Sequence, residues 1–210
     1  MMIPKKLTDL YKGLSPKELF YISARWAVSP MRAVERAIPA TGRIYDIGCG
    51  AGLLSNFAVI SSDKRNITGI DLSEDRINIA KKSVLGRKNV SFEKADVMKF
   101  DFVSPDVVMA CDVLHHMSYA DQESLLRRIY KSLGAGGIVL IQDIDKRPWH
   151  KYLFGLLADR IINNMAPAYY RTEKEFMSLL KDIGFEVESS HIDKWYPTPS
   201  ILLKCTKTGR

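Results

Sequence analysis

The sequence predicts a doubly wound α/β fold, in which helices cover both faces of a seven-stranded, mostly parallel sheet. Two observations support this prediction. Between residues 44 and 144, five apolar segments with strand character alternate with segments of helical periodicity, a pattern typical of parallel sheets. The last two strand-like segments, residues 185–192 and 201–206, are joined by a short loop with no helix between them. They must therefore pair antiparallel, so we expect strand 7 to be the antiparallel strand.

An N-terminal helical cap is expected over residues 1–40, before a single structural unit at residues 41–210. Residues 1–14 are basic and show no clear periodicity. Ser15-Pro-Lys-Glu18 has the pattern of a capping box with proline at the first helical position, so it predicts the start of a helix. Ser29-Pro30 repeats this start signal and predicts a second short helix over residues 31–38.

The strands and helices of the main unit follow from local patterns. Expected strands cover residues 44–47, 66–72, 90–95, 106–114 and 138–144, and expected helices cover residues 53–62, 73–83, 122–133 and 149–165. Ser73 is expected to cap one of these helices, and a capping box from Thr172 to Glu175 opens a further one.

The composition is compatible with several functions and does not distinguish between them. The 210 residues carry a net charge of +7, which permits contact with nucleic acid, anionic lipid or an acidic substrate. The three cysteines, Cys49, Cys111 and Cys205, have no metal-ligand spacing, which suits a reducing cytoplasm. We find no signal peptide and no run of 18 apolar residues that would span a membrane.

A glycine-rich turn follows the first strand, in the stretch IYDIGCGAGLLS at residues 44–55. Glycine lacks the Cβ that would keep a nucleotide-like ligand away from the backbone. The dinucleotide fingerprint requires G-x-G-x-x-G, but here the third glycine comes one residue early and Asp46 precedes the first by two. This spacing argues against a nicotinamide-dependent oxidoreductase.

The pattern Asp-x-Gly-x-Gly-x-Gly resembles motif I of the class I S-adenosylmethionine-dependent methyltransferases. This resemblance implies a Rossmann-like fold closed by an antiparallel strand, and S-adenosyl-L-methionine as the cofactor. It also implies that the cofactor contacts the motif, at Asp46, Gly48, Cys49, Gly50 and Gly52.

Further cofactor contacts are expected where later strands end. Asp71 ends the second strand, where one carboxylate can accept both ribose hydroxyls, although it could instead be an ordinary acid at a helix N-terminus. Leu72 would pack on the adenine. Asp96 resembles the family acid that accepts from the adenine amino group, with Val97 as a backbone donor, but it could be an ordinary loop residue.

The fourth strand ends in Asp112, within ACDVLHHM, which should face the methyl group. DVLHHM resembles a signature of small-molecule and lipid-head methyltransferases, and it does not resemble the Asn/Asp-Pro-Pro-Tyr signature of enzymes that methylate DNA or protein glutamine. His115 and His116 are candidate bases, although one imidazole could simply fill space.

Residues after the fifth strand complete the candidate site. Asp143 and Tyr169 are further catalytic candidates. Asp143 and Asp145 could bind a divalent ion with Asp112, but the adjacent Asp-Asn pair of metal-dependent relatives is missing, so no metal is expected. Arg171, in the insert between strands five and six, could bind an anionic acceptor or pair with Asp143 or Asp145. The apolar helix at 149–165 could pack as core or lid, or contact lipid.

The function expected from these features is cytoplasmic methyl transfer to a small-molecule or lipid-like acceptor, with an oxygen nucleophile preferred. Two alternatives stay open: an RNA methyltransferase that uses the basic surface, and a catalytically silent, cofactor-binding subunit. Nucleic acid is a disfavoured partner, peripheral membrane contact is open, and the sequence does not give the oligomeric state.

Overall fold

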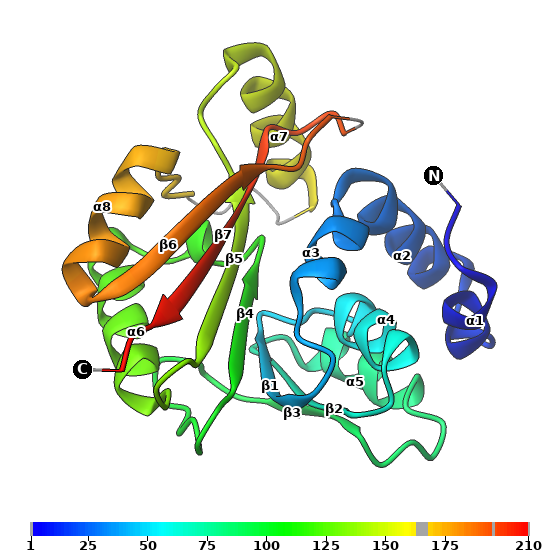
Figure 1. The fold of residues 1–210 in the computed structure, drawn as a ribbon. Helices are drawn as coiled ribbons and strands as arrows, with labels where there is room; N and C mark the ends of the chain where they lie inside the picture. Colours follow the sequence, from blue (N-terminus) through cyan, green and yellow to red (C-terminus); the bar gives the residue numbers. More distant parts are fainter. Residues whose placement is uncertain (1, 163–167, 195, 210) are drawn as a thin grey trace.

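The protein folds around one seven-stranded sheet with the strand order β3-β2-β1-β4-β5-β7-β6 (Figure 1). The structure is a computed structural model, and it describes residues 2–162, 168–194 and 196–209. The strands are β1 (Gly42–Ile47), β2 (Arg65–Asp71), β3 (Val90–Lys94), β4 (Val107–Cys111), β5 (Ile138–Ile144), β6 (Phe185–His191) and β7 (Ser200–Lys207). Strand β7 runs antiparallel to both β5 and β6, while the other neighbours pair in parallel. The predicted fold class is therefore confirmed.

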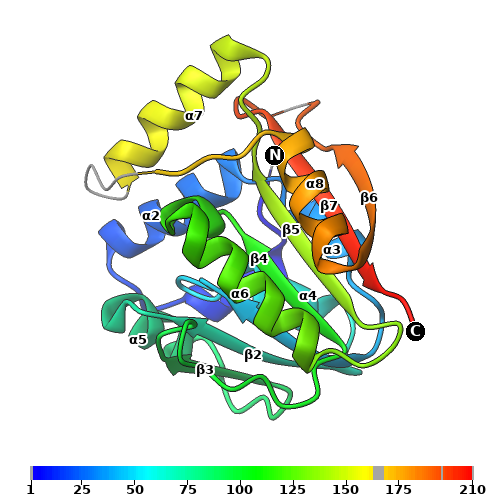
Figure 2. The same cartoon turned by 90° about the vertical axis from the view of Figure 1, so that its left-hand side faces the viewer.

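Helices cover both faces of the sheet (Figure 2). They are α1 (Lys5–Thr8), α2 (Pro16–Val28), α3 (Met31–Ala37), α4 (Leu53–Ser61), α5 (Glu74–Lys82), α6 (Tyr119–Ser132), α7 (Trp149–Ile162) and α8 (Glu173–Ile183), with 3-10 turns η1 (Asp9–Tyr11) and η2 (Leu114–His116). One core cluster joins the sheet to the cap helices, α4 and α5, and the other joins it to α6 and α8. Alternate residues of β1 serve the two clusters, because successive strand side chains point to opposite faces.

Local signals place several helix starts as expected. The Ser15 hydroxyl accepts from the Glu18 backbone N–H while the Glu18 carboxylate accepts from the Ser15 N–H, so the predicted capping box is present. Ser73 caps α5, and Thr172 forms the second capping box at the start of α8. These helices begin where the sequence predicts because caps depend on residues only three apart.

Ser29 does not act as the predicted helix cap. Helix α3 begins after Pro30 with no side-chain cap, and the Ser29 hydroxyl donates instead to Oδ2 of Asp112 at 2.9 Å. The prediction was wrong because the half-buried Asp112 carboxylate, from the loop after β4, competes for the hydroxyl.

The end of β4 also differs from the sequence prediction, and α6 begins at Tyr119 rather than Gln122. Strand β4 stops at Cys111 rather than Leu114, because Asp112 takes a left-handed backbone conformation with φ of 51° that ends the extended chain. Helix α7 is described as far as Ile162, and the last three residues of the predicted helix lie outside the described part.

The cap is linked to the sheet by a buried arginine at the start of β2. Arg65 donates to the carbonyls of Pro39, Ile38 and Ala58 and pairs with Glu35 of α3 at 2.7 Å. The planar guanidinium can satisfy several acceptors at once, so the α3 end of the cap is fixed against β2 and α4. Among the residues the structure describes, we find no helix with the length and apolar character needed to cross a membrane.

Candidate functional site

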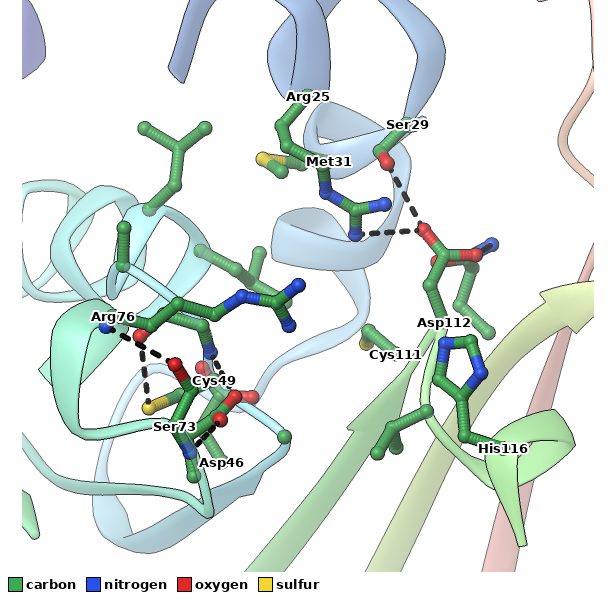
Figure 3. A pocket seen from close by; sticks show the side chains of 18 of the residues that line it. Arg25, Ser29, Met31, Asp46, Cys49, Ser73, Arg76, Cys111, Asp112 and His116 are labelled. Carbon is green, nitrogen blue, oxygen red and sulfur yellow. Dashed lines mark hydrogen bonds and ion pairs between the residues drawn. The ribbon is translucent and has the colours of Figure 1, made fainter. Parts of the chain in front are cut away.

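A cavity of about 520 Å³ opens at the carboxyl ends of β1, β2 and β4, beneath α2 and α3 (Figure 3). This is the edge of a doubly wound sheet at which ligands bind, where the strand order reverses between β1 and β4. The cap contributes Tyr21, Ile22, Arg25, Ser29, Met31 and Val34 to the cavity wall. Cap and sheet therefore build the site together.

The glycine turn lets the backbone form one wall of the cavity. Gly50 has φ of 55°, and a Cβ placed there would meet nothing closer than the Tyr21 hydroxyl at 3.7 Å. Gly48 has φ of 68°, and its Cβ would come within 2.3 Å of Val113. The absence of a side chain at Gly48 therefore lets the loop after β4 pack closely against the glycine turn. At Gly50 it leaves the backbone open to the cavity.

Gly52 has a packing role. It does not line the cavity, and a Cβ there would come within 2.5 Å of the Phe92 ring on β3. The third glycine of the motif thus allows the start of α4 to lie against the sheet.

Asp71 lies in the cavity wall and is 8% exposed. Its Oδ2 accepts from the Gly50 N–H and its Oδ1 from the Ser73 N–H, both at 2.8 Å. A carboxylate has about four acceptor positions, so two remain for hydroxyl donors in the cavity. The neighbouring Leu72 is 65% exposed and also lines the cavity, which gives an apolar surface beside the acid.

Asp46 contributes a buried carboxyl group to the same wall. The Ser55 hydroxyl donates to its Oδ2. Burial raises the pKa of Asp46 to about 7; Ser55 opposes this shift and the nearby Asp71 adds to it. A cation entering the cavity would favour the ionised form of this group.

Asp112 joins the cap to the sheet across one side of the cavity (Figure 3). Its Oδ2 accepts from Arg25 at 3.1 Å and from Ser29, while Oδ1 accepts from Gln142 of β5 at 2.9 Å. The expected cofactor residue is therefore held by three side-chain donors, and it sets how closely α2 approaches the β4 loop.

The two neighbouring histidines have different surroundings. His116 is half-buried and lines the cavity beside Asp112 and Met117. His115 is 1% exposed and lies behind the wall, with its Nδ1 2.6 Å from Oδ1 of Asp143. The two imidazole rings meet edge to face at 4.2 Å. Only His116 of the pair is thus placed to meet a molecule in the cavity, while His115 and Asp143 support it from behind.

The insert residues lie outside the cavity wall. Tyr169 donates its backbone N–H to the His115 carbonyl at 2.6 Å and stacks edge to face on Tyr119. Arg171 donates to Gln122 at 2.8 Å and lies over the Tyr119 ring, so it pairs with neither Asp143 nor Asp145 as one interpretation expected. That pairing fails because the Gln122 side chain on α6 lies within reach of the guanidinium.

Asp96 also lies outside the wall, whereas Val97 lines it. The Asp96 carboxylate accepts from the Met98 N–H at 2.9 Å and so shapes the loop that presents Val97. Sequence reasoning missed Arg76, Cys111 and Gln142, which line the cavity from α5, β4 and β5. The place of Arg76 in the cavity wall could have been predicted from the sequence, because the first turn of the helix that follows the second strand borders this cavity.

No group of three or more His, Cys, Asp or Glu side chains is placed to hold a metal ion within the described part of the chain. The thiols of Cys49 and Cys111 are free, and burial raises the pKa of both, so they stay protonated.

The site fits S-adenosylmethionine. Asp71 offers acceptors for a diol, Leu72 an apolar surface for a base, Gly50 an open backbone wall, and Asp46 a carboxyl group that a cationic ammonium would ionise. Fold and site together define a class I S-adenosylmethionine-dependent methyltransferase.

Comparison with known proteins agrees with this class. The chain belongs to the methyltransferase domain family, whose model matches residues 21–190. The ubiquinone biosynthesis O-methyltransferase of Dechloromonas aromatica is 30% identical over 67% of this chain and 61% of its own length. The carboxy-S-adenosyl-L-methionine synthase of Helicobacter hepaticus is 27% identical over 80% of this chain and 77% of its own. Human N-acetylserotonin methyltransferase, solved in complex with S-adenosylmethionine, superposes with a TM-score of 0.73 at 21% identity, covering 99% of this chain and 61% of that one.

Proposed function

We propose that this methyltransferase methylates an oxygen of a small or lipid-like acceptor, and that His116 accepts the proton of the acceptor hydroxyl. The observation that supports this most directly is the position of His116. It lines the cavity beside Asp112, on the side opposite Asp46, Ser73 and Arg76 (Figure 3). An imidazole facing the space left beside a bound cofactor is suited to proton transfer near neutral pH.

The cofactor supplies an electrophilic methyl group on a sulfonium. The chain's own residues bind and orient: Asp71 would accept the ribose hydroxyls, Leu72 and Val97 would contact the adenine, and Asp46 would face the ammonium group. Asp96 would act on the adenine through the loop that carries Val97. Apolar side chains such as Met31 and Leu54 exclude water from the rest of the cavity.

His115 and Asp143 serve as positioning residues. The 2.6 Å contact between them is buried, and the His115 ring meets the His116 ring at 4.2 Å. The backbone contact from Tyr169 to the His115 carbonyl adds a further constraint on this turn. Together these contacts hold the 3-10 turn that presents His116 to the cavity.

The preference for oxygen draws support from the relatives. The Dechloromonas aromatica protein is named a ubiquinone biosynthesis O-methyltransferase, so the acceptor atom that its name gives is oxygen. This chain spans only 61% of that relative's length, so the name of the relative does not by itself assign an acceptor to this chain. An oxygen acceptor is therefore part of the proposal. The three free cysteines fit the reducing cytoplasm that we also infer.

The test is methylation with S-adenosylmethionine labelled in its methyl group, using fractionated cell extract and a panel of phenols and catechols. We expect label in the small-molecule or lipid fraction, as a methyl ether identified by mass spectrometry. His116→Ala should lower the turnover about 10²- to 10⁴-fold while calorimetric binding of S-adenosylhomocysteine is unchanged. The matched control is His191→Ala, at an exposed histidine outside the cavity wall.

Three results would overturn the proposal. Label in RNA, with retention that falls steeply with salt, would favour the RNA methyltransferase. Cofactor binding without any labelled product would favour the silent subunit. Full activity of His116→Ala would remove the proposed base.

A further inference from the structure

Helix α7 presents apolar side chains to solvent along one side. Trp149 is 73% exposed, Leu153 46%, Phe154 47% and Leu157 53%. Residues 149, 153 and 157 are spaced four apart and so lie on one helix face, with Phe154 beside them. We call these four residues the α7 apolar face. Contiguous apolar exposure of this kind marks an interaction surface.

The opposite side of α7 is packed against the protein, which fixes the direction of this face. A Cβ at the buried Gly155 would come within 3.1 Å of Ile144 on β5. The Tyr152 ring meets Tyr170 edge to face at 5.5 Å, and Lys151 pairs with Asp193 at 2.6 Å. The α7 apolar face therefore cannot turn inward without breaking these contacts.

Helix α2 lies on the same side of the molecule as α7 and also carries exposed apolar residues (Figure 2). Its Phe20 is 75% exposed and Leu19 41% exposed. Thr198 lies between the two helices. Its hydroxyl donates to the Val28 carbonyl at the end of α2, and a Cβ placed at Gly155 of α7 would lie 3.5 Å from its methyl group. Helix α2 also carries Tyr21 and Arg25, which line the cofactor cavity.

Basic residues lie beside the α7 apolar face, and two of them have acidic partners: Lys151 pairs with Asp193 at 2.6 Å, and Lys146 lies 3.8 Å from Glu175. Lys146, Arg147, His150 and Lys151 precede or begin the helix, and no acidic residue occurs between residues 146 and 158. Arg147 and His150 are exposed. An amphipathic helix with Trp, Leu and Phe on one face and cations beside it is suited to an anionic lipid surface.

We propose that α7 and α2 dock this protein on an anionic membrane surface. The apolar side chains enter the boundary between headgroups and acyl chains, while the exposed Arg147 meets lipid phosphates. A second copy of the chain is a poorer occupant, because a symmetric contact through this face would bring its cations together. Since α2 also covers the cavity, docking sets the site beside the lipid. The inference rests on the surface alone and does not depend on the acceptor.

The test is co-sedimentation of the full chain with vesicles of phosphatidylcholine, and with vesicles of equal parts phosphatidylcholine and phosphatidylglycerol. We expect binding to the mixed vesicles that weakens with salt. Leu153→Ser with Leu157→Ser should lower the partition coefficient at least about 10-fold. Arg147→Gln should lower it about 5-fold at low salt.

A matched control is Leu85→Ser with Val103→Ser, two apolar residues that are 66% and 55% exposed outside the two docking helices. This pair should leave vesicle binding unchanged, and both double variants should bind S-adenosylhomocysteine like the wild type. Absence of vesicle binding would overturn the proposal, as would equal losses in both double variants. A dimer that the Leu153/Leu157 variant dissociates, with no binding to vesicles, would assign the face to a second copy instead.

Discussion

Asp46 is a cavity residue whose protonation changes near neutral pH, because burial raises its pKa to about 7. An unfolded aspartate titrates near 4, so between pH 4 and 7 the folded protein binds more protons at this position than the unfolded chain. Stability therefore falls as pH rises through this window, by at most about 1.4 kcal/mol per pH unit for the single proton.

Asp46→Asn should remove this part of the pH dependence. The amide is neutral at every pH, and it can keep a hydrogen bond with the Ser55 hydroxyl. We expect the cofactor-free variant to lose less stability than the wild type between pH 5 and 7, measured by urea unfolding. Asp101→Asn, at an exposed position, is the control. Parallel pH profiles for wild type and Asp46→Asn would contradict the assignment.

Asp143 acts on the reaction through His115, so its replacement should affect turnover more than cofactor binding. Asp143→Asn retains the size of the side chain but removes the charge that faces the His115 Nδ1. We expect kcat to fall about 10-fold or more with KM for S-adenosylmethionine within about 2-fold, because the residue does not line the cavity. Steady-state kinetics against both substrates checks this. A rise in KM with kcat unchanged would show that the pair instead shapes cofactor binding.

At the scale of elements, the N-terminal segment reaches the glycine turn through one tyrosine. Tyr11 is 1% exposed, donates to the Ala51 carbonyl at 3.0 Å and accepts from Asn56 at 2.8 Å. Asn56 in turn binds Ser83 and Arg87. A segment without helical periodicity thus supports the glycine turn.

Tyr11→Phe should destabilise the fold by about 1–3 kcal/mol, because it leaves the buried Ala51 carbonyl and an Asn56 N–H without this partner. We also expect weaker binding of S-adenosylhomocysteine, since Ala51 lies in the glycine turn and lines the cavity. Chemical denaturation and calorimetry measure the two effects. An unchanged stability would mean that the network adjusts around the lost hydroxyl.

The elements that the sequence predicted well depend on short-range signals. The Ser15 and Thr172 capping boxes and the glycine turn involve residues within a few positions of one another. Ser29 has the same local signal, but its hydroxyl binds a carboxylate 83 residues away, and the local rule fails there. The segment at residues 1–14 was unpredictable for the same reason, because its order comes from the buried Tyr11 and Leu7 rather than from periodicity.

At the scale of the whole molecule, the site depends on contacts between distant parts of the chain. Motif positions predicted Asp46, Gly50, Asp71 and Asp112 in the cavity wall, where the structure has them. No sequence pattern could distinguish His116 in the cavity from His115 behind it, because that depends on how η2 packs against β5. The ion pair of Arg25 with Asp112 could not be predicted from the sequence either, because the two residues are 87 positions apart.

Because cap and sheet share one cavity, a bound ligand should stabilise the whole fold. At about 100 times its dissociation constant, S-adenosylhomocysteine should add about 2.7 kcal/mol, which for a chain of this size corresponds to a rise in Tm of about 5–10 °C. Asp71→Asn should weaken the acceptor proposed for the ribose hydroxyls and lower the affinity about 10- to 100-fold, which removes about half of this rise or more. Asp75→Asn, at an exposed acid on the next helix and outside the cavity wall, should keep it. Differential scanning calorimetry of the three proteins with and without ligand decides the matter. Equal shifts in both variants would exclude Asp71 as the residue that holds the ligand.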